Sequence, residues 1–245
     1  MANFSKWLGA GLGWTFAGPI GGILGFVLGS FVDEFSESEL LEYKKGGSIK
    51  STQSGDFEIS LLVLAAIVIK ADGSVDKREL DFVRTSFIGM YGEERANHAF
   101  KLFKGIISNN KISTKQVCFQ INKNMNHASR LQLLHFLFGV AKSDGMVTER
   151  ELNKINTIAG YLNINHSDFG SIKAMFYNDV DSSYKILEIE KSATDAELKD
   201  AYRRMVKKYH PDKLRNLGPE HIKGGEEKFR QVQNAYEQIQ KERGL

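Results

Sequence analysis

The chain of 245 residues has one cysteine, three prolines and almost no excess of charge. The single thiol, Cys118, excludes an internal disulfide framework and any zinc site built from several cysteines. Three prolines argue against proline-rich linkers and against a β-protein with many proline turns. The net charge of +3 is too small to indicate nucleic acid as the main partner. With 42% hydrophobic and 26% charged residues, the composition is that of a soluble chain with one large domain or two modest ones.

Charged side chains are absent from the 26 residues between Trp7 and Val32. An uncharged apolar run longer than about 18 residues predicts a transmembrane helix, because about 20 residues cross the hydrocarbon core. Pro19 would kink this helix or divide it into two short halves. The run is too long for a secretory signal, and it ends at Asp33 and Glu34 rather than at a small-residue cleavage site. We therefore expect residues 1–35 to be a glycine-rich apolar segment that anchors the chain in a membrane.

Glycines in this segment repeat at a spacing that lets two helix backbones approach closely in lipid, which predicts self-association. The pairs are Gly9 and Gly13, Gly18 and Gly22, Gly21 and Gly25, and Gly25 and Gly29. The alternative is an apolar arm that packs on the protein's own surface or inside an oligomer. More lysines follow the run than precede it, which places the folded part in the cytoplasm. Residues 36–55 are polar and are predicted to be a linker.

The middle of the chain contains an internal repeat. The segments KADGSVDKREL, from Lys70, and KSDGMVTEREL, from Lys142, align without gaps at an offset of 72 residues. Each follows a short apolar run, and each Asp-Gly pair predicts a tight turn. Asp76 and Thr148 then stand at N-cap positions, with a glutamate three residues later as in a capping box. The repeat predicts helix, turn, helix, used twice. With further helical patterns at 93–108, 113–124 and 167–177, residues 56–179 are predicted to be an all-α bundle.

The acidic residues of the two turns also suggest a metal site. An ordinary EF-hand is not expected, because Gly73 at the glycine position would put Val68 and Lys70 where oxygen ligands are needed. A weaker site that pools acids from both copies stays open beside the simple roles of turn and cap. Its candidate ligands are Asp72, Asp76, Glu79, Asp144 and Glu151. No cofactor is predicted from the sequence.

The carboxy-terminal 65 residues show two amphipathic helices. A capping box at Thr194 and Glu197 opens the first of them. Its apolar residues form one continuous face: Leu198, Ala201, Tyr202, Met205, Val206 and Tyr209. Its basic residues, Arg203, Arg204, Lys207 and Lys208, lie mostly away from that face. The tripeptide from His210 to Asp212 ends this helix, because its proline cannot continue it. The second helix carries an apolar stripe of Phe229, Val232, Tyr236 and Ile239.

The composition of this tripeptide does not indicate a catalytic site. His210 and Asp212 have no nucleophile at a recognisable spacing, and one histidine with one aspartate is a poor metal site. A basic helix that ends in a rigid polar loop is typical of a docking surface for an acidic protein. The sequence thus predicts a binding module and no enzyme.

Three resemblances extend this interpretation. Segments 184–213 and 229–240 resemble the J-domain, since the HPD signature stands between both flanking helix patterns. The paired K-x-D-G-x-V-x-x-x-E-L segments resemble the TerB-like (tellurite-resistance B) fold. The order of apolar segment, TerB-like bundle and J-domain resembles the DnaJ-like co-chaperones of the DjlA type. No Gly/Phe-rich segment and no repeated C-x-x-C module follows the J-domain, so the usual general client-binding parts of DnaJ are missing.

The J-domain resemblance implies an Hsp70 (DnaK-type) chaperone as partner and stimulation of its ATP hydrolysis. His210, Pro211 and Asp212 would then trigger the chaperone, and Arg203, Arg204, Lys207 and Lys208 would dock it. The expected domains are the apolar segment 1–35, the linker 36–55, the TerB-like domain 56–179 and the J-domain 181–245. The expected location is a bacterial inner membrane with the domains in the cytoplasm, or alternatively the cytoplasm itself. The competing hypothesis is a stress- or metal-responsive TerB-like scaffold in which the J-domain is subsidiary.

Overall fold

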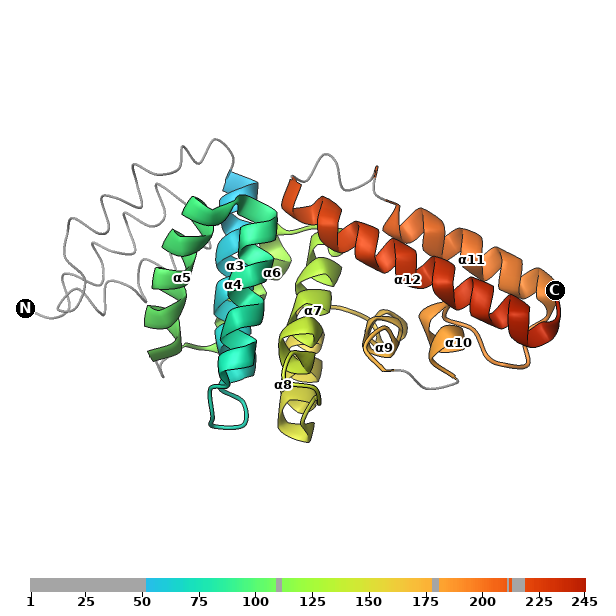
Figure 1. Ribbon diagram of the computed structural model, residues 1–245, viewed down its shortest axis with the longest axis horizontal. Coiled ribbons are helices and arrows are strands. Elements are labelled where there is room, and N and C mark those ends of the chain that lie inside the picture. Colours follow the sequence, from blue (N-terminus) through green and yellow to red (C-terminus); the bar gives the residue numbers. More distant parts are fainter. Residues whose placement is uncertain (1–51, 109–111, 178–180, 211, 213–218) are drawn as a thin grey trace, which may run out of the picture.

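The computed structural model describes residues 52–108, 112–177, 181–210, 212 and 219–245, and within these ranges it contains helices and no strand. The predicted all-α class is confirmed. The predicted anchor at 1–35 and Pro211 lie outside the described residues. In chain order the helices are α3 (Thr52–Ile69), α4 (Lys77–Tyr91), α5 (Glu93–Ser108), α6 (Thr114–Asn124), α7 (His127–Lys142), α8 (Glu149–Tyr161), α9 (His166–Ala174), α10 (Ser182–Ile186), α11 (Asp195–Tyr209) and α12 (Pro219–Arg243), as Figure 1 shows.

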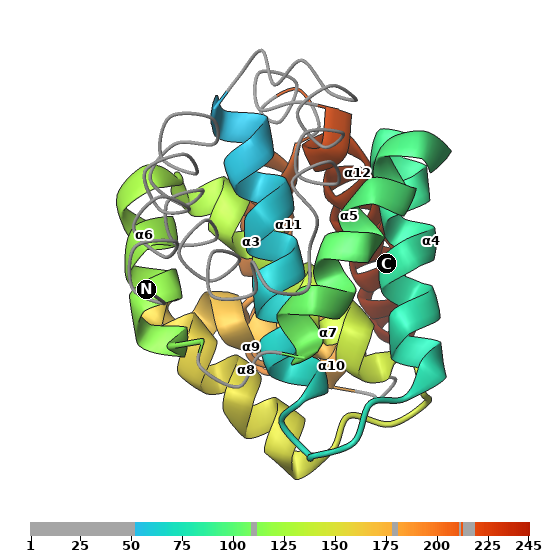
Figure 2. The ribbon, with the colours of Figure 1, turned by 90° about the vertical axis from the view of Figure 1, so that its left-hand side faces the viewer.

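The core of the first domain is built around α3 and α7, the helices that precede the two Asp-Gly turns. Both carry apolar residues on nearly all sides, which is typical of helices buried all round. They pack against each other, and α3 also contacts α5, α6 and α8 (Figure 2). Leu64 and Val68 of α3, like Leu134 and Phe138 of α7, are completely buried. The two copies of the repeat therefore share one core.

Each turn of the repeat ends in the predicted cap. Gly73 and Gly145 have φ angles of 91° and 112°, the left-handed region that glycine enters without steric cost. Asp76 caps α4, and Thr148 caps α8. In both cases the glutamate three residues later accepts a hydrogen bond from the cap's own backbone N–H, which completes a capping box. The predicted unit of helix, turn and helix is confirmed in both copies.

The carboxy-terminal region is a hairpin of α11 and α12 with the short α10 against α12. Leu198 and Met205 of α11 are buried, and Ile239 of α12 is buried as well. The rings of Tyr202 and Tyr236 stack between the two helices with centroids 4.2 Å apart. The predicted apolar faces are therefore the faces that meet.

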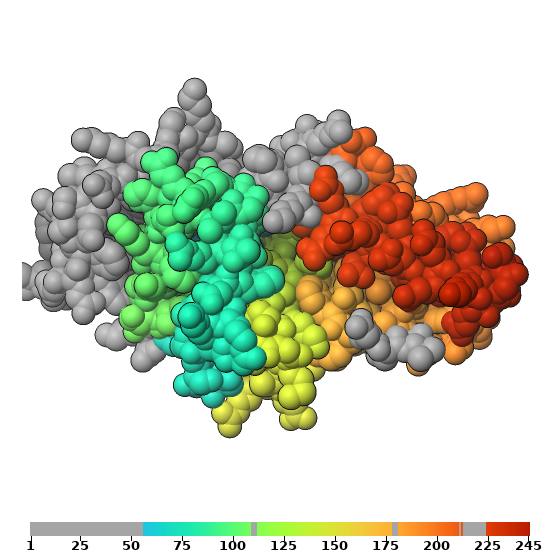
Figure 3. All heavy atoms as spheres, in the orientation of Figure 1, coloured from blue at the N-terminus to red at the C-terminus, as the bar shows by residue number. Residues whose placement is uncertain are grey.

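The two regions are in direct contact. Helix α12 lies against α7 and α4, and α10 lies against α9. The space-filling view shows the red surface of α12 adjoining the surfaces of α4 and α7 (Figure 3). Gly224 faces the side chain of Gln132 in α7, and a Cβ at this position would stand 2.5 Å from its Oε1. The hairpin is thus held in a defined position beside the bundle.

Candidate functional site

The site predicted from the sequence begins on α11, whose start is fixed by its capping box. The Thr194 hydroxyl oxygen accepts a hydrogen bond from the Glu197 N–H at 3.3 Å, and the Thr194 N–H donates to the Glu197 carboxylate at 2.7 Å. Leu198, Ala201, Met205 and Tyr209 face the core. This register leaves the helix's cations outside the hydrophobic interface, as the apolar period predicts.

Three of the four predicted docking cations are exposed. They are Arg203, Arg204 and Lys207. Arg203 pairs with Asp200 of the same helix at 3.2 Å, but both side chains are well exposed, so this pair adds little stability. Arg203, Val206, Lys207 and His210 together line a shallow depression on the outer side of α11. The depression combines an apolar floor with cations, which suits an acidic protein surface.

The fourth cation, Lys208, has a different environment. Its side chain is only 26% exposed, and its Nζ lies 2.6 Å from the Glu188 carboxylate. The same Nζ forms an ion pair with Asp168 of α9, in the neighbouring domain. The positive charge of Lys208 is therefore balanced inside the molecule, whereas that of Lys207 faces the solvent.

His210 ends α11 with an extended backbone, φ −60° and ψ 128°, as expected for a residue before proline. Its Nδ1 accepts a hydrogen bond from the Asp212 N–H at 3.2 Å. With Nδ1 as acceptor, the proton of a neutral imidazole is on Nε2. The imidazole ring also meets the ring of Phe229 edge to face, with centroids 5.9 Å apart. Neither contact supplies a nucleophile, so this geometry suits recognition better than catalysis.

Two residues of α12 that pack against the end of α11 were not predicted as part of the site. Phe229 was assigned only to an apolar stripe, but it holds the His210 ring. Lys228 is 1% exposed, and its Nζ lies 5.7 Å from the centroid of the Tyr209 ring. Burial lowers the pKa of Lys228 well below the usual lysine value. Its position could have been found from the period, because Lys228 precedes the buried Val232 by four residues and Ile239 by eleven.

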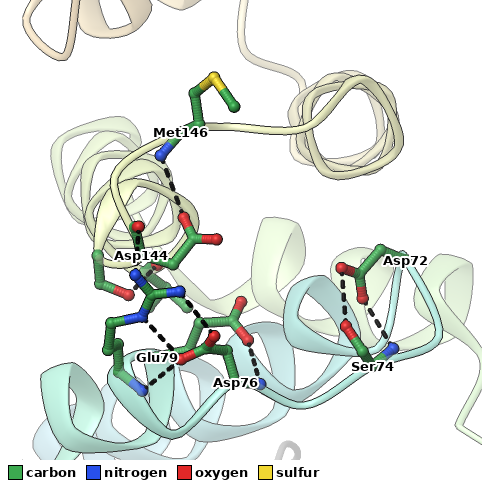
Figure 4. Close-up of polar contacts among 9 residues, drawn as sticks. Asp72, Ser74, Asp76, Glu79, Asp144 and Met146 are labelled. Atoms are coloured by element: carbon green, nitrogen blue, oxygen red, sulfur yellow. Dashed lines mark hydrogen bonds and ion pairs between the residues drawn. The ribbon is translucent and has the colours of Figure 1, made fainter.

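The candidate metal ligands lie in the two Asp-Gly turns and are engaged in local contacts. Asp72 accepts hydrogen bonds from both the backbone and the hydroxyl of Ser74, and Asp144 accepts one from the Met146 N–H (Figure 4). Asp76 pairs with Arg78 at 2.9 Å, and the hydrogen bonds from Arg78 lower the pKa of Asp76 to about 2. These contacts are those of turns and caps.

Two arginines join the turns to each other. Arg78 donates to the backbone oxygen of Asp144 at 2.8 Å, and Arg150 donates to that of Asp72 at 3.2 Å. The two copies are therefore connected by arginine side chains and not by carboxylates that face each other. In the part of the chain that the structure describes, no three histidine, cysteine or acidic side chains are arranged to hold a metal ion.

Glu79 and Glu151 complete the two capping boxes and are almost fully buried, at 5% and 4% exposed. Burial raises the pKa of Glu79 to about 7, and the nearby charge of Glu151 adds to this rise. The geometry of both residues is that of a helix cap.

Comparison with known protein families gives three matches in chain order. The model of the Co-chaperone DjlA transmembrane domain matches residues 1–51, that of Tellurite resistance protein TerB residues 58–174, and that of the DnaJ domain residues 182–243. The chain is a DnaJ-like protein of the DjlA type. The TerB match covers the bundle from α3 to α9, and the DnaJ match covers α10 to α12.

Relatives of the DjlA type align with almost the whole chain. The "Co-chaperone protein DjlA" of Coxiella burnetii is 26% identical, over 98% of this chain and 98% of its own length. That of Photobacterium profundum is 25% identical, over 99% of both chains. The J-domain alone is more similar: the "Chaperone protein DnaJ" of Erysipelothrix rhusiopathiae is 56% identical over 54 residues, which are 22% of this chain and 13% of the relative. No solved structure matches the chain.

The transmembrane match falls on residues outside the described part of the chain. Among the helices that the structure does describe, none combines the length and apolarity that crossing a bilayer requires. The TerB and J-domain resemblances are confirmed by the matches, and so is the DjlA-type order of parts. The roles of the individual docking residues stay predictions.

Proposed function

We propose that this DnaJ-type co-chaperone docks on an Hsp70 chaperone through its J-domain and stimulates ATP hydrolysis by that chaperone. The observation that carries the proposal is the exposed loop at His210 and Asp212 beside the depression lined by Arg203 and Lys207. Cations there attract an acidic partner and fix its orientation, and His210 follows them at the end of α11. Arg204 extends the same charged surface.

The protein itself would carry no active site in this scheme. By binding one conformation of the chaperone more tightly than the other, the J-domain would shift the chaperone toward the state that hydrolyses ATP. His210, Pro211 and Asp212 would make the contact that distinguishes the two states. The absence of a nucleophile from the described contacts of His210 is consistent with this role.

Steady-state ATP hydrolysis by the Hsp70 of the same organism tests the proposal. The full-length protein in lipid nanodiscs should accelerate hydrolysis, and His210→Gln should return the rate to that of the chaperone alone. His98→Gln is the matched control, because α5 lies at the opposite end of the molecule from α11 (Figure 1). Thermal unfolding should be the same for both variants. Full stimulation by the folded His210→Gln protein would refute the proposed function.

We also propose that residues 1–35 anchor the protein in the bacterial inner membrane, with the folded domains on the cytoplasmic side. The uncharged run from Trp7 to Val32, the transmembrane family match and the lysines that follow the run support this arrangement. The chain should stay with membranes at alkaline pH. Protease should cleave its J-domain in inside-out vesicles and leave it intact in spheroplasts. Release by alkali would contradict the anchor. Self-association through the glycine spacing stays a prediction.

A further inference from the structure

Two adjacent lysines near the end of α11 have opposite environments. Lys207 is exposed and lines the depression beside His210. Lys208 is 26% exposed and forms ion pairs with Glu188 and with Asp168 of the TerB-like domain. Asp168 and Lys208 thus form a charged contact between the two domains, two residues before the loop that the chaperone is proposed to bind. This contact competes with any partner that needs the charge of Lys208.

Asp168 can release Lys208 without becoming an isolated buried charge. Its side chain is only 2% exposed, so losing every partner would be costly. However, its Oδ2 also accepts a hydrogen bond from the Asn165 side chain at 2.9 Å and lies 2.8 Å from Nε2 of His127. Both of these partners belong to the TerB-like domain and would stay when Lys208 leaves. Loss of the Lys208 ion pair would therefore leave the Asp168 carboxylate with two partners.

Glu188, the second partner, adopts an unusual backbone conformation. Its φ angle is +58°, in the left-handed region that residues other than glycine rarely adopt. Such a conformation persists only where the surrounding structure holds it, and it is found often at functional sites. Here it accompanies a carboxylate placed 2.6 Å from Nζ of Lys208, in the short link between α10 and α11. The local strain and the ion pair occur in the same residue.

We propose that Lys208 exchanges between these two carboxylates of its own chain and an acidic surface of the chaperone, so that the contact with the TerB-like domain limits docking. This inference rests on the proposed function and adds its regulation. When Lys208 is held by Asp168 and Glu188, the J-domain docks through Arg203, Arg204 and Lys207 alone. When Lys208 is released, a further cation becomes available to the partner. By linkage, any change that weakens the interdomain contact should strengthen docking.

A double-mutant cycle on the full-length protein tests the exchange, with the concentration that gives half-maximal ATPase stimulation as the readout. The backgrounds are wild type, the single variants Asp168→Asn and Glu188→Gln, and the variant that carries both, because each carboxylate alone still pairs with Lys208. In wild type, Lys208→Ala should change this concentration by about twofold or less, because Lys208 is held by Asp168 and Glu188 and contributes little to docking. Where both carboxylates are replaced, Lys208→Ala should raise it by about fivefold, and in each single variant the rise should be smaller. Lys207→Ala is the matched control and should have the same effect in every background.

Each outcome has a separate meaning. A larger effect of Lys208→Ala in the freed backgrounds, with equal effects of Lys207→Ala, supports the exchange. An equal effect of Lys208→Ala in all backgrounds overturns the exchange and leaves the proposed function intact. A wild-type protein that does not stimulate the chaperone overturns the proposed function, and the exchange with it. Thermal unfolding checks that each variant is folded. If Asp168→Asn is not folded, the result with Glu188→Gln decides between these outcomes.

Discussion

The turn at Gly73 and the loop that follows His210 each connect two helices through polar residues, but they direct those residues differently. In the turn, Asp72 accepts hydrogen bonds from Ser74, and Asp76 pairs with Arg78. In the loop, the imidazole of His210 is 44% exposed, and the carboxylate of Asp212 is 62% exposed. The first arrangement stabilises the fold, while the second keeps both side chains exposed to solvent. Polar residues in such a turn therefore favour a binding role where their side chains are exposed.

The largest effect that would sharpen this comparison is expected in the loop. Asp212→Asn should reduce stimulation of the Hsp70 ATPase at least about tenfold, because a charged contact with the partner is lost. Its melting temperature should match that of the wild type, since the carboxylate is exposed. ATPase assays and calorimetry on the same preparation measure both. A destabilised protein with normal stimulation would reverse the assignment of the two regions.

The buried cap of the turn should show its role in the pH dependence of stability. The pKa of Glu79 is about 7 in the folded protein, above the ordinary value of 4.5. The folded state therefore binds a proton that the unfolded chain has lost, so the free energy of unfolding should fall as pH rises from about 4.5 to about 7. Glu79→Gln should lose this part of the pH dependence. Urea titrations across that window test it, and an unchanged slope would contradict the assigned protonation.

A smaller effect is expected at the cap of the second copy. Thr148→Ala removes the hydroxyl that accepts a hydrogen bond from the Glu151 N–H. Loss of such a cap should reduce the free energy of unfolding by about 1 kcal/mol. Stimulation of the chaperone should be unchanged at a temperature where the variant is folded. A loss of stimulation without loss of stability would mean that the turns contact the partner.

The smallest effect should be kinetic. Lys207→Glu reverses one exposed charge of the depression and should slow association with the chaperone about threefold at low salt. The difference from wild type should shrink as salt is added, because screening weakens attraction between exposed charges. Stopped-flow or surface-binding measurements over a salt series give the rates. A difference that does not depend on salt would place Lys207 in a buried contact.

Local patterns predicted much of the fold. The 3.6-residue period located the apolar faces of α11 and α12, and both capping boxes of the repeat were predicted residue by residue. The amino-terminal parts of two helices were not revealed by these patterns. Helix α3 begins at Thr52, within the predicted linker. The sequence did not reveal this start, because the first turn has no apolar residue that would show a helical period. Helix α12 runs through Gly224 and Gly225, although glycine is unfavourable inside a helix.

The candidate site was predicted less completely than the fold. Four cations on one helix were assigned to one docking surface, because a sequence shows which residues point away from the core. It does not show what lies opposite them. Lys208 meets Asp168 only because α9 comes beside α11, and these two residues are 40 positions apart in the chain. The contact of Phe229 with His210 likewise depends on how the two helices of the hairpin pack.

The amino-acid order alone determined where the capped helices start, which faces are apolar and which loop carries the histidine and aspartate. These properties depend on neighbours within a few residues, where capping, turn geometry and helical periodicity act. The tertiary structure decided which charges remain free. Lys207 and Lys208 are identical in chemistry and adjacent in sequence, yet only the second meets a buried carboxylate. Burial and ion pairing are set by packing between distant segments, and packing separates a residue that docks a partner from one that holds two domains together.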